Sequence, residues 1–174
     1  MSRINQKNFW FNRLMVAQSI STKDNDMVHY SVFRVSKENW EKIQKSHNRV
    51  VKEYIDSEND QVLDVGCAFG RTYIKNIKNY VGIDLSPDFI NIAKEKYPDK
   101  SFINVDMENY HPEFKFDWAI CSSIKEMIIR ENGIEDWEKK EEHLKKICKR
   151  ILILEYTPAY EEGYVATEII EGYE

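Results

Sequence analysis

Cysteine is scarce in this sequence, and its scarcity excludes two classes of small, cross-linked protein. The 174 residues include three cysteines, Cys67, Cys121 and Cys148, which lie far apart and show no C-x-x-C spacing. We therefore expect neither a disulfide framework nor a zinc site, and we expect the thiols to be reduced. The histidines predict no metal site either, because His47 and His143 fall on predicted helices without companions at ligand spacing.

Long apolar runs and dense basic runs are also missing. The apolar run 151–154 is far shorter than the roughly 20 residues that a membrane helix needs, and the N-terminal residues lack the basic-then-apolar layout of a secretion signal. Lys and Arg number 25 against 30 Asp and Glu, which gives a formal net charge of −5 at pH 7. Because polyphosphate backbones attract basic surfaces, this net charge disfavours a nucleic-acid partner. Since neither a membrane helix nor a secretion signal is indicated, we expect a cytoplasmic protein without a membrane partner.

The sequence does contain enough apolar material for one globular core. Hydrophobic residues make up 42% of the chain and aromatic residues 13%. A chain of this length can bury about 70% of the surface of its unfolded state. We therefore expect one domain over residues 1–174, made of an N-terminal helical lid or cap (1–58), an α/β core (59–156) and a C-terminal edge segment (157–174).

The order of the predicted elements indicates the fold class. Ser36 is suited to cap a helix that apolar positions at helical spacing predict as far as residue 55. Beyond it, strands alternate with helices, which predicts an α/β fold with a Rossmann-like, doubly wound and mostly parallel sheet covered on both faces. The expected strands are residues 61–65, 80–84, 101–105, 116–121 and 150–155, and the expected helices are residues 71–79, a segment from residue 86, 124–130 and 136–149.

Two further predictions concern the periphery of the fold. The charged run 138–142, which includes Lys140, is expected to be a helix face in contact with water. Residues 164–170 are expected to add one strand at the edge of the sheet.

A turn rich in small residues follows the first predicted strand. Residues 64–70 read Asp-Val-Gly-Cys-Ala-Phe-Gly, so Gly66, Ala68 and Gly70 leave little side-chain bulk along the loop. Such a loop can turn sharply and lets a ligand approach its backbone. In open α/β sheets, ligands bind beyond the carboxyl ends of the strands, which is where this loop falls.

Acidic residues follow the next two predicted strands. Asp84 stands twenty residues after Asp64 and can accept hydrogen bonds from both hydroxyls of a ribose lying over the turn. Asp106 can accept from an adenine amino group, the Met107 N–H can reach a ring nitrogen, and Leu85 can pack on the base. Each feature alone has a structural explanation as turn or loop chemistry, but their order at three successive strand ends favours a nucleoside-binding site.

Residues 62–70 and 81–86 together resemble the class I S-adenosylmethionine-dependent methyltransferases. The resemblance covers roughly residues 60–156, and the first motif is its most specific part. It implies that S-adenosylmethionine is the cofactor, that Asp64 and the 66–70 loop lie beside its methionine moiety, and that Asp84 and Asp106 bind its ribose and adenine. Ala68 stands where the family commonly has a third glycine. The cofactor-binding residues expected on this basis are Asp64, Gly66, Cys67, Ala68, Gly70, Asp84, Leu85, Asp106, Met107 and Cys121.

A nicotinamide or flavin dinucleotide fold, and with it an oxidoreductase, is the nearest alternative. Its fingerprint G-x-G-x-x-G brings a helix end close to the pyrophosphate. In this chain Arg71 occupies the position of the last glycine. The spacing therefore favours the methyltransferase interpretation.

The resemblance implies methyl transfer by in-line displacement, with the acceptor entering near Cys121 and the loop after Glu155. Such a reaction depends on orientation and desolvation, and a dedicated base is optional. The catalytic residues are unknown from the sequence. The weak candidates are Ser122, Ser123, His111 and Tyr156, and two further conceivable proton acceptors are His29 and Glu155.

The acceptor is expected to be a small molecule or a glycan. Family motifs for the methylation of DNA amino groups place a proline-rich aromatic tetrapeptide after the fourth strand, whereas residues 121–124 of this chain read Cys-Ser-Ser-Ile. The Pro-Cys nucleophile that a cytosine-ring enzyme needs is also absent. The N-terminal segment is the candidate lid over the cofactor, although packing on the core is the stronger explanation for any one of its residues. The candidates for the lid are Tyr30, Phe33, Arg34 and Trp40.

A catalytically silent cofactor-binding partner is the alternative from a different class. Only 18 residues follow Tyr156, too few for the helix and full hairpin that commonly complete the family's sheet. The edge of the sheet is therefore expected to be truncated or paired with another subunit, which would make a homo-oligomer.

The ribose assignment gives a first prediction. Asp84→Ala should weaken S-adenosylhomocysteine binding by about 1.5–3 kcal/mol, the scale of hydrogen bonds to a charged group. Isothermal titration calorimetry measures the change, and an unchanged affinity would refute the assignment.

Overall fold

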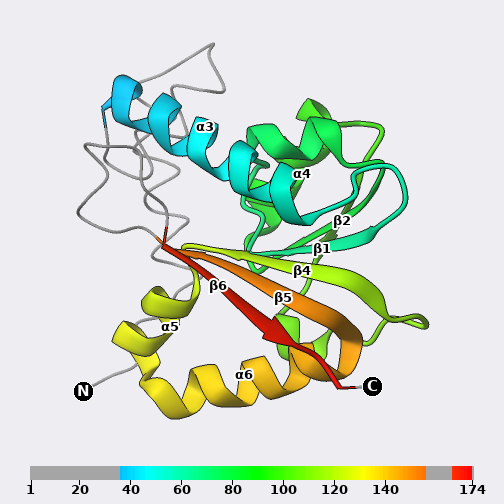
Figure 1. Cartoon of the computed structure of the whole chain (residues 1–174), viewed down its shortest axis with the longest axis vertical. Helices are drawn as coiled ribbons and strands as arrows, with labels where there is room; N and C mark the ends of the chain where they lie inside the picture. The colour runs from blue at the N-terminus through cyan, green and yellow to red at the C-terminus, as the bar shows by residue number, and fades with distance from the viewer. Residues whose placement is uncertain (1–35, 156–165, 174) are drawn as a thin grey trace.

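A six-stranded sheet forms the centre of the computed structural model, which describes residues 36–155 and 166–173 (Figure 1). The strand order is β3-β2-β1-β4-β5-β6, in which the first five strands are parallel and β6 runs antiparallel to β5. The predicted doubly wound, mostly parallel sheet is therefore confirmed. The strands are β1 Gln61–Val65, β2 Asn79–Asp84, β3 Ser101–Asn104, β4 Phe116–Ser122, β5 Cys148–Glu155 and β6 Ala166–Glu171.

Helices cover both faces of the sheet, α3 and α4 on one side and α5 and α6 on the other (Figure 1). Ser36 caps α3 as predicted, because its Oγ accepts a hydrogen bond from Asn39 N at 3.2 Å. Ser86 caps α4 in the same way, and Pro87 occupies the first turn. The helical elements are α3 Lys37–Tyr54, η1 Thr72–Asn76, α4 Pro87–Lys96, η2 Met107–Asn109, α5 Lys125–Asn132 and α6 Ile134–Ile147.

The segment predicted as a helix over residues 71–79 is a short 3-10 helix, η1. Ile74 and Ile77, three residues apart, are both almost completely buried, and Ile77 N donates to Ile74 O at 3.2 Å. A 3-10 helix repeats every three residues and so places both side chains on the same face. Because β2 begins at Asn79, few residues remain after η1 and the helix cannot extend further.

The prediction that the charged run 138–142 faces water is wrong at Lys140. The exposed fraction of this residue is 9%, and its Nζ lies 3.1 Å from a Glu108 carboxylate oxygen and 3.3 Å from one of Asp136. Lys140 follows Trp137 by three residues and therefore lies on the buried stripe of α6 rather than on its outer face. Its ion pair with Glu108 joins α6 to η2.

The two faces of the sheet have separate hydrophobic cores. Val50 and Val51 of α3 and Ile90 and Ala93 of α4 pack on one face. On the other face, Ile128 of α5 and Trp137 and Leu144 of α6 pack against alternate residues of the same strands. The boundaries predicted for an N-terminal cap and a C-terminal edge segment remain predictions, since residues 1–35 and 156–165 lie outside the described part of the chain.

The interior strand β5 and the edge strand β6 differ in the burial of their side chains, so substitutions in them should differ in their effect on the free energy of unfolding. Leu152 is completely buried, whereas its register partner Ile169 is 39% exposed. Leu152→Ala should lower the free energy of unfolding by about 2–5 kcal/mol, because it leaves a cavity in the core. Ile169→Ala is the matched control and should cost less than about 1 kcal/mol. Equal losses in chemical denaturation would contradict the assignment of β6 as an edge strand.

Candidate functional site

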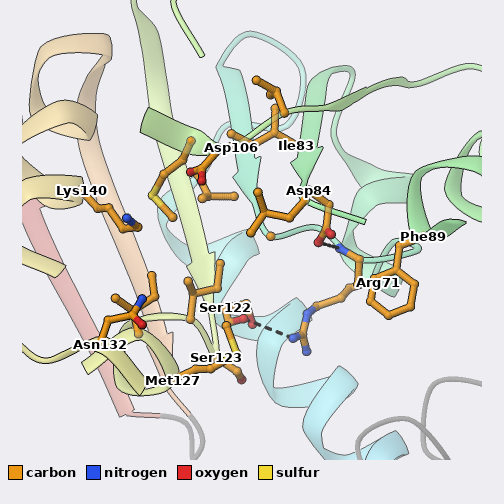
Figure 2. Close-up of a pocket in the computed structure, with 18 residues that line it drawn as sticks. Arg71, Ile83, Asp84, Phe89, Asp106, Ser122, Ser123, Met127, Asn132 and Lys140 are labelled. Atoms are coloured by element: carbon orange, nitrogen blue, oxygen red, sulfur yellow. Dashed lines mark hydrogen bonds between the residues drawn. The ribbon is translucent and has the colours of Figure 1, made fainter. Parts of the chain in front are cut away.

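A cavity lies beyond the carboxyl ends of the four parallel strands β3, β2, β1 and β4 (Figure 2). Its wall receives residues from each strand end, because strands that run in parallel deliver their following loops to the same edge of the sheet. α5 and α6 close the opposite side. The lining residues are Val65, Gly66, Ala68, Arg71, Ile83, Asp84, Leu85, Phe89, Val105, Asp106, Met107, Ser122, Ser123, Ile124, Met127, Ile128, Asn132 and Lys140.

The small-residue turn adopts backbone conformations that explain its composition. Gly66, Ala68 and Gly70 all have positive φ, at 64°, 48° and 86°. A Cβ at Gly66 would lie 2.5 Å from Ile124 Cδ1, and a Cβ at Gly70 would lie 2.5 Å from Tyr97 Cε2. Ala68 is the exception, since an alanine is strained at positive φ and a glycine is not. The family's preference for glycine at this position follows from the same geometry.

Asp84 joins the turn to the loop after β2. Its Oδ2 accepts from Ala68 N at 3.0 Å and its Oδ1 from Ser86 N at 2.8 Å. A carboxylate has about four lone-pair sites, so capacity remains for the two hydroxyls of a ribose. Burial raises the pKa of Asp84 to about 6, although the hydrogen bonds from Ser86 and Ala68 oppose that shift.

The residues predicted to contact adenine lie in the same cavity. Asp106 caps η2 by accepting from Glu108 N at 3.3 Å, and Met107 follows it on the cavity wall. Leu85 is 38% exposed and lines the cavity, so its side chain is available to a flat apolar ligand. Asp84, Asp106 and the turn therefore converge on one cavity, and the chemistry of this donor and acceptor set fits an adenosyl group.

Four of the predicted cofactor residues lie behind the cavity wall. Asp64 is 1% exposed and its Oδ2 accepts from Tyr80 Oη at 2.7 Å. Cys67 and Cys121 are also buried, and burial raises the pKa of each thiol well above its usual value. Gly70 faces Tyr97. None of the four lines the cavity, and direct contact of any of them with a cofactor remains a prediction.

The weak catalytic candidates separate into two groups. Ser122 and Ser123 line the cavity, and Ser123 has a positive φ of 58°. His111 is outside the lining and packs edge-on against His143, with ring centroids 5.2 Å apart. Tyr156 and His29 lie outside the described residues, as do the lid candidates Tyr30, Phe33 and Arg34.

Glu155 has a structural partner rather than a place on the cavity wall. Its Oε1 accepts from Glu126 N at 3.2 Å, at the start of α5. Burial raises the pKa of Glu155, and the hydrogen bonds from the first N–H groups of α5 oppose that shift. Since Ile124 supplies no side-chain cap, Glu155 caps α5 from β5.

Sequence reasoning missed the role of Arg71. This residue is 6% exposed and lines the cavity, and its Nη2 donates to Ser122 O at 3.3 Å. The fully buried His47 lies with Nδ1 3.5 Å from Arg71 Nη1 and 3.3 Å from Ser122 Oγ. The pKa of His47 lies well below its usual value, mainly because the ring is buried and also because the Arg71 charge is near, so the imidazole is neutral. The only sequence signal was a cation directly after the small-residue turn.

Two negative findings concern only residues 36–155 and 166–173. Within these residues no cluster of three or more His, Cys, Asp or Glu side chains is arranged to hold a metal ion. No helix in this part of the chain has the length and apolar character needed to cross a membrane.

Comparisons with known proteins agree with the geometry. Residues 62–147 match the family model described as a methyltransferase domain. A malonyl-[acyl-carrier protein] O-methyltransferase from Ilyobacter polytropus is 31% identical over 101 residues, which cover 52% of this chain and 38% of that protein. This chain thus spans well under half the length of that curated relative.

Solved structures show the same fold. One is a magnesium protoporphyrin IX methyltransferase from Synechocystis PCC 6803, crystallised with bound S-adenosylmethionine. Its TM-score is 0.63 at 14% identity, and the match covers 96% of this chain and 92% of that chain. A methyltransferase from Clostridium acetobutylicum has a TM-score of 0.56 at 19% identity, with 75% of this chain and 55% of that chain covered. Residues 62–147 therefore match the methyltransferase domain family, and the solved structures show the fold of S-adenosylmethionine-dependent methyltransferases.

The pKa of Asp84 predicts how cofactor affinity depends on pH. Ribose hydroxyls donate to the ionised carboxylate, which becomes protonated as the pH falls through about 6. The affinity for S-adenosylhomocysteine should therefore fall by about tenfold between pH 7.5 and pH 5, because a group with this pKa is mostly protonated at the lower pH. Calorimetry across this range measures the change. Asp84→Asn is the control and should lose this dependence, and a flat profile in the unsubstituted protein would contradict the assignment.

Proposed function

We propose that this chain transfers a methyl group from S-adenosylmethionine to a small-molecule or glycan-type acceptor by in-line displacement. The observation that carries the proposal is the convergence of Asp84, Asp106 and the turn at Gly66 on one cavity. Asp106, Asp84 and the turn lie at the ends of the neighbouring strands β3, β2 and β1, and they match the base, the ribose and the methionine chain of the cofactor in that order. The match of residues 62–147 to the methyltransferase domain family supports the same activity.

The cavity supplies orientation and exclusion of water. When bound, S-adenosylmethionine supplies a methyl group on a sulfonium, which is already activated for displacement. Asp84 would hold the ribose, and the turn would fix the methionine chain against Ser122 at the end of β4. Apolar side chains from β2 and α5, among them Ile83 and Met127, exclude water from the reacting atoms. Ser122 and Ser123 are in position to orient an acceptor, and a dedicated base is not required.

The names of the relatives agree with an acceptor that is not a nucleic acid. One relative is named for a malonyl group carried on acyl carrier protein, and one structural neighbour for magnesium protoporphyrin IX. The formal net charge of −5 also disfavours a polyphosphate acceptor. Another neighbour with a TM-score of 0.54 is named as a [4+2]-cyclase, so the fold alone does not fix the reaction.

Cofactor binding and turnover test the proposal separately. Calorimetry should show that S-adenosylhomocysteine binds more tightly than NAD, because Asp84 and the turn match one adenosyl group and Arg71 replaces the glycine of the dinucleotide fingerprint. S-adenosylmethionine with a labelled methyl group, incubated with a panel of small acids, alcohols, amines and glycans, should then label at least one acceptor. The variant Asp84→Ala is the control and should label less at limiting cofactor.

Each negative outcome has a distinct meaning. Tighter binding of NAD would overturn the proposal in favour of an oxidoreductase. Binding of S-adenosylhomocysteine without turnover on any acceptor would favour the catalytically silent partner.

A further inference from the structure

Arg71 determines which nitrogen of the buried His47 carries the proton. Its side chain reaches from the turn after β1 to the carbonyl of Ser122 (Figure 2), and its Nη1 lies 3.5 Å from His47 Nδ1. A guanidinium has only N–H donors, so Nδ1 must be the acceptor and the proton of the neutral ring must be on Nε2. His47 Nε2 is buried without a hydrogen-bond partner, so the contacts at Nδ1 alone set the tautomer.

This tautomer fixes the direction of the Ser122 hydroxyl. Ser122 Oγ lies 3.3 Å from the same His47 Nδ1. Because Nδ1 carries no proton, the hydroxyl must be the donor in this contact. Its proton is then engaged with the ring, and its oxygen keeps lone pairs for a ligand. Since Ser122 lines the cavity, it presents to the cavity a hydroxyl that accepts hydrogen bonds and donates none.

The neighbouring Ser123 lacks such an anchor. It also lines the cavity, but within the part of the chain that the structure describes no side chain fixes the direction of its hydroxyl. A hydroxyl that is free to rotate can donate or accept, as the ligand requires. Discrimination between methyl acceptors therefore depends on Ser122.

A hydroxyl that only accepts distinguishes the groups that a sulfonium can methylate. A carboxylate has no proton, so its oxygens would meet the lone pairs of Ser122. An alcohol can donate, but it is a weak nucleophile until it loses its proton. His47 is a poor base for that proton, because burial and the Arg71 charge lower the pKa of its imidazole. A neutral amine donates an N–H group to Ser122 and keeps its own lone pair for the methyl group.

We propose that the methyl acceptor is a neutral primary or secondary amine, that Ser122 Oγ accepts one of its N–H groups, and that His47 positions the Ser122 hydroxyl for this contact. The inference rests on the proposed function, because it takes the cofactor and the methyl transfer from that proposal. The nearby Arg71 guanidinium keeps the amine neutral, since it disfavours a second cation beside it.

The transfer is balanced without a base. The nitrogen lone pair forms the new N–C bond, and the C–S bond breaks with its electron pair moving to sulfur. The products are S-adenosylhomocysteine and a methylammonium ion, which retains the proton and the positive charge that the sulfonium has lost. Repulsion from Arg71 then favours release of this cation.

The first test compares acceptors that differ only in the reacting group. The full chain is incubated with S-adenosylmethionine carrying a labelled methyl group and with two sets of acceptors. One set is benzylamine, benzyl alcohol and benzoate, and the other is glucosamine, glucose and glucuronate. Transfer to at least one of the two amines should be about tenfold faster than to the alcohol and the carboxylate of its set, the scale of one hydrogen bond.

Ser122→Ala tests the contact itself with the amine that is labelled fastest. The variant should lower kcat by about tenfold, because the N–H group becomes a stronger donor as positive charge develops on nitrogen in the transition state. Its dissociation constant for S-adenosylhomocysteine, measured by calorimetry, should stay within about threefold of that of the unsubstituted protein, since the contact is with the acceptor. Weaker cofactor binding with an unchanged kcat would place Ser122 against the cofactor and overturn the inference.

His47 has a conservative replacement and a matched control. His47→Gln retains an oxygen that can accept from Ser122 and should keep most of kcat. His47→Leu frees the Ser122 hydroxyl and should reduce the preference for the amine by about fivefold. His143→Leu is the control, because His143 also lies on a helix, with Nε2 3.0 Å from Tyr110 O, but outside the cavity lining, so neither rate nor preference should change. Equal losses of activity in His47→Gln and His47→Leu, with the preference unchanged, would make His47 purely structural.

The outcomes separate this inference from the proposed function. Faster transfer to an alcohol or a carboxylate than to the matched amine would overturn the inference and leave the proposed function intact. Binding of S-adenosylhomocysteine without labelling of either amine would also overturn the inference. The proposed function would then depend on the other acceptors. Failure of the unsubstituted protein to bind S-adenosylhomocysteine would overturn both.

Discussion

The carboxylate of Asp84 connects the parts of the protein on which the site depends. It accepts hydrogen bonds from Ala68 N in the turn after β1 and from Ser86 N at the start of α4. The carbonyl of the same residue accepts from Val105 N, which precedes Asp106. One residue at the end of β2 therefore fixes the loops on both sides of it, and a shift of this residue would displace the turn and the adenine-facing loop together.

This arrangement carries energetic costs that a site for an adenosyl cofactor explains. Burial raises the pKa of Asp84 to about 6, which means that the ionised form is held in unfavourable surroundings. Ala68 and Ser123 have positive φ although neither is a glycine, and both line the cavity. Strain and burial of this kind concentrate at functional sites, where the surrounding structure maintains them.

Both helical layers contribute to the cavity that the strand ends open. From one face of the sheet, α3 holds Arg71 through Trp40 and His47. From the other face, Lys140 of α6 pairs with Glu108 and so fixes η2, which follows Asp106. The helices thus complete the fold and also set the position of charged groups at the two ends of one site.

The sequence by itself determined the order of the elements and the acidic positions of the site. Strand and helix periodicity, the small residues of the turn and the acids Asp84 and Asp106 are local features, and parallel strands necessarily bring their carboxyl ends to one edge. Tertiary structure alone decided the placement of His47, Arg71 and Lys140, because each depends on packing between segments far apart in the chain. The same reason applies to η1, whose 3-10 form follows from the burial of Ile74 and Ile77 in the space before β2.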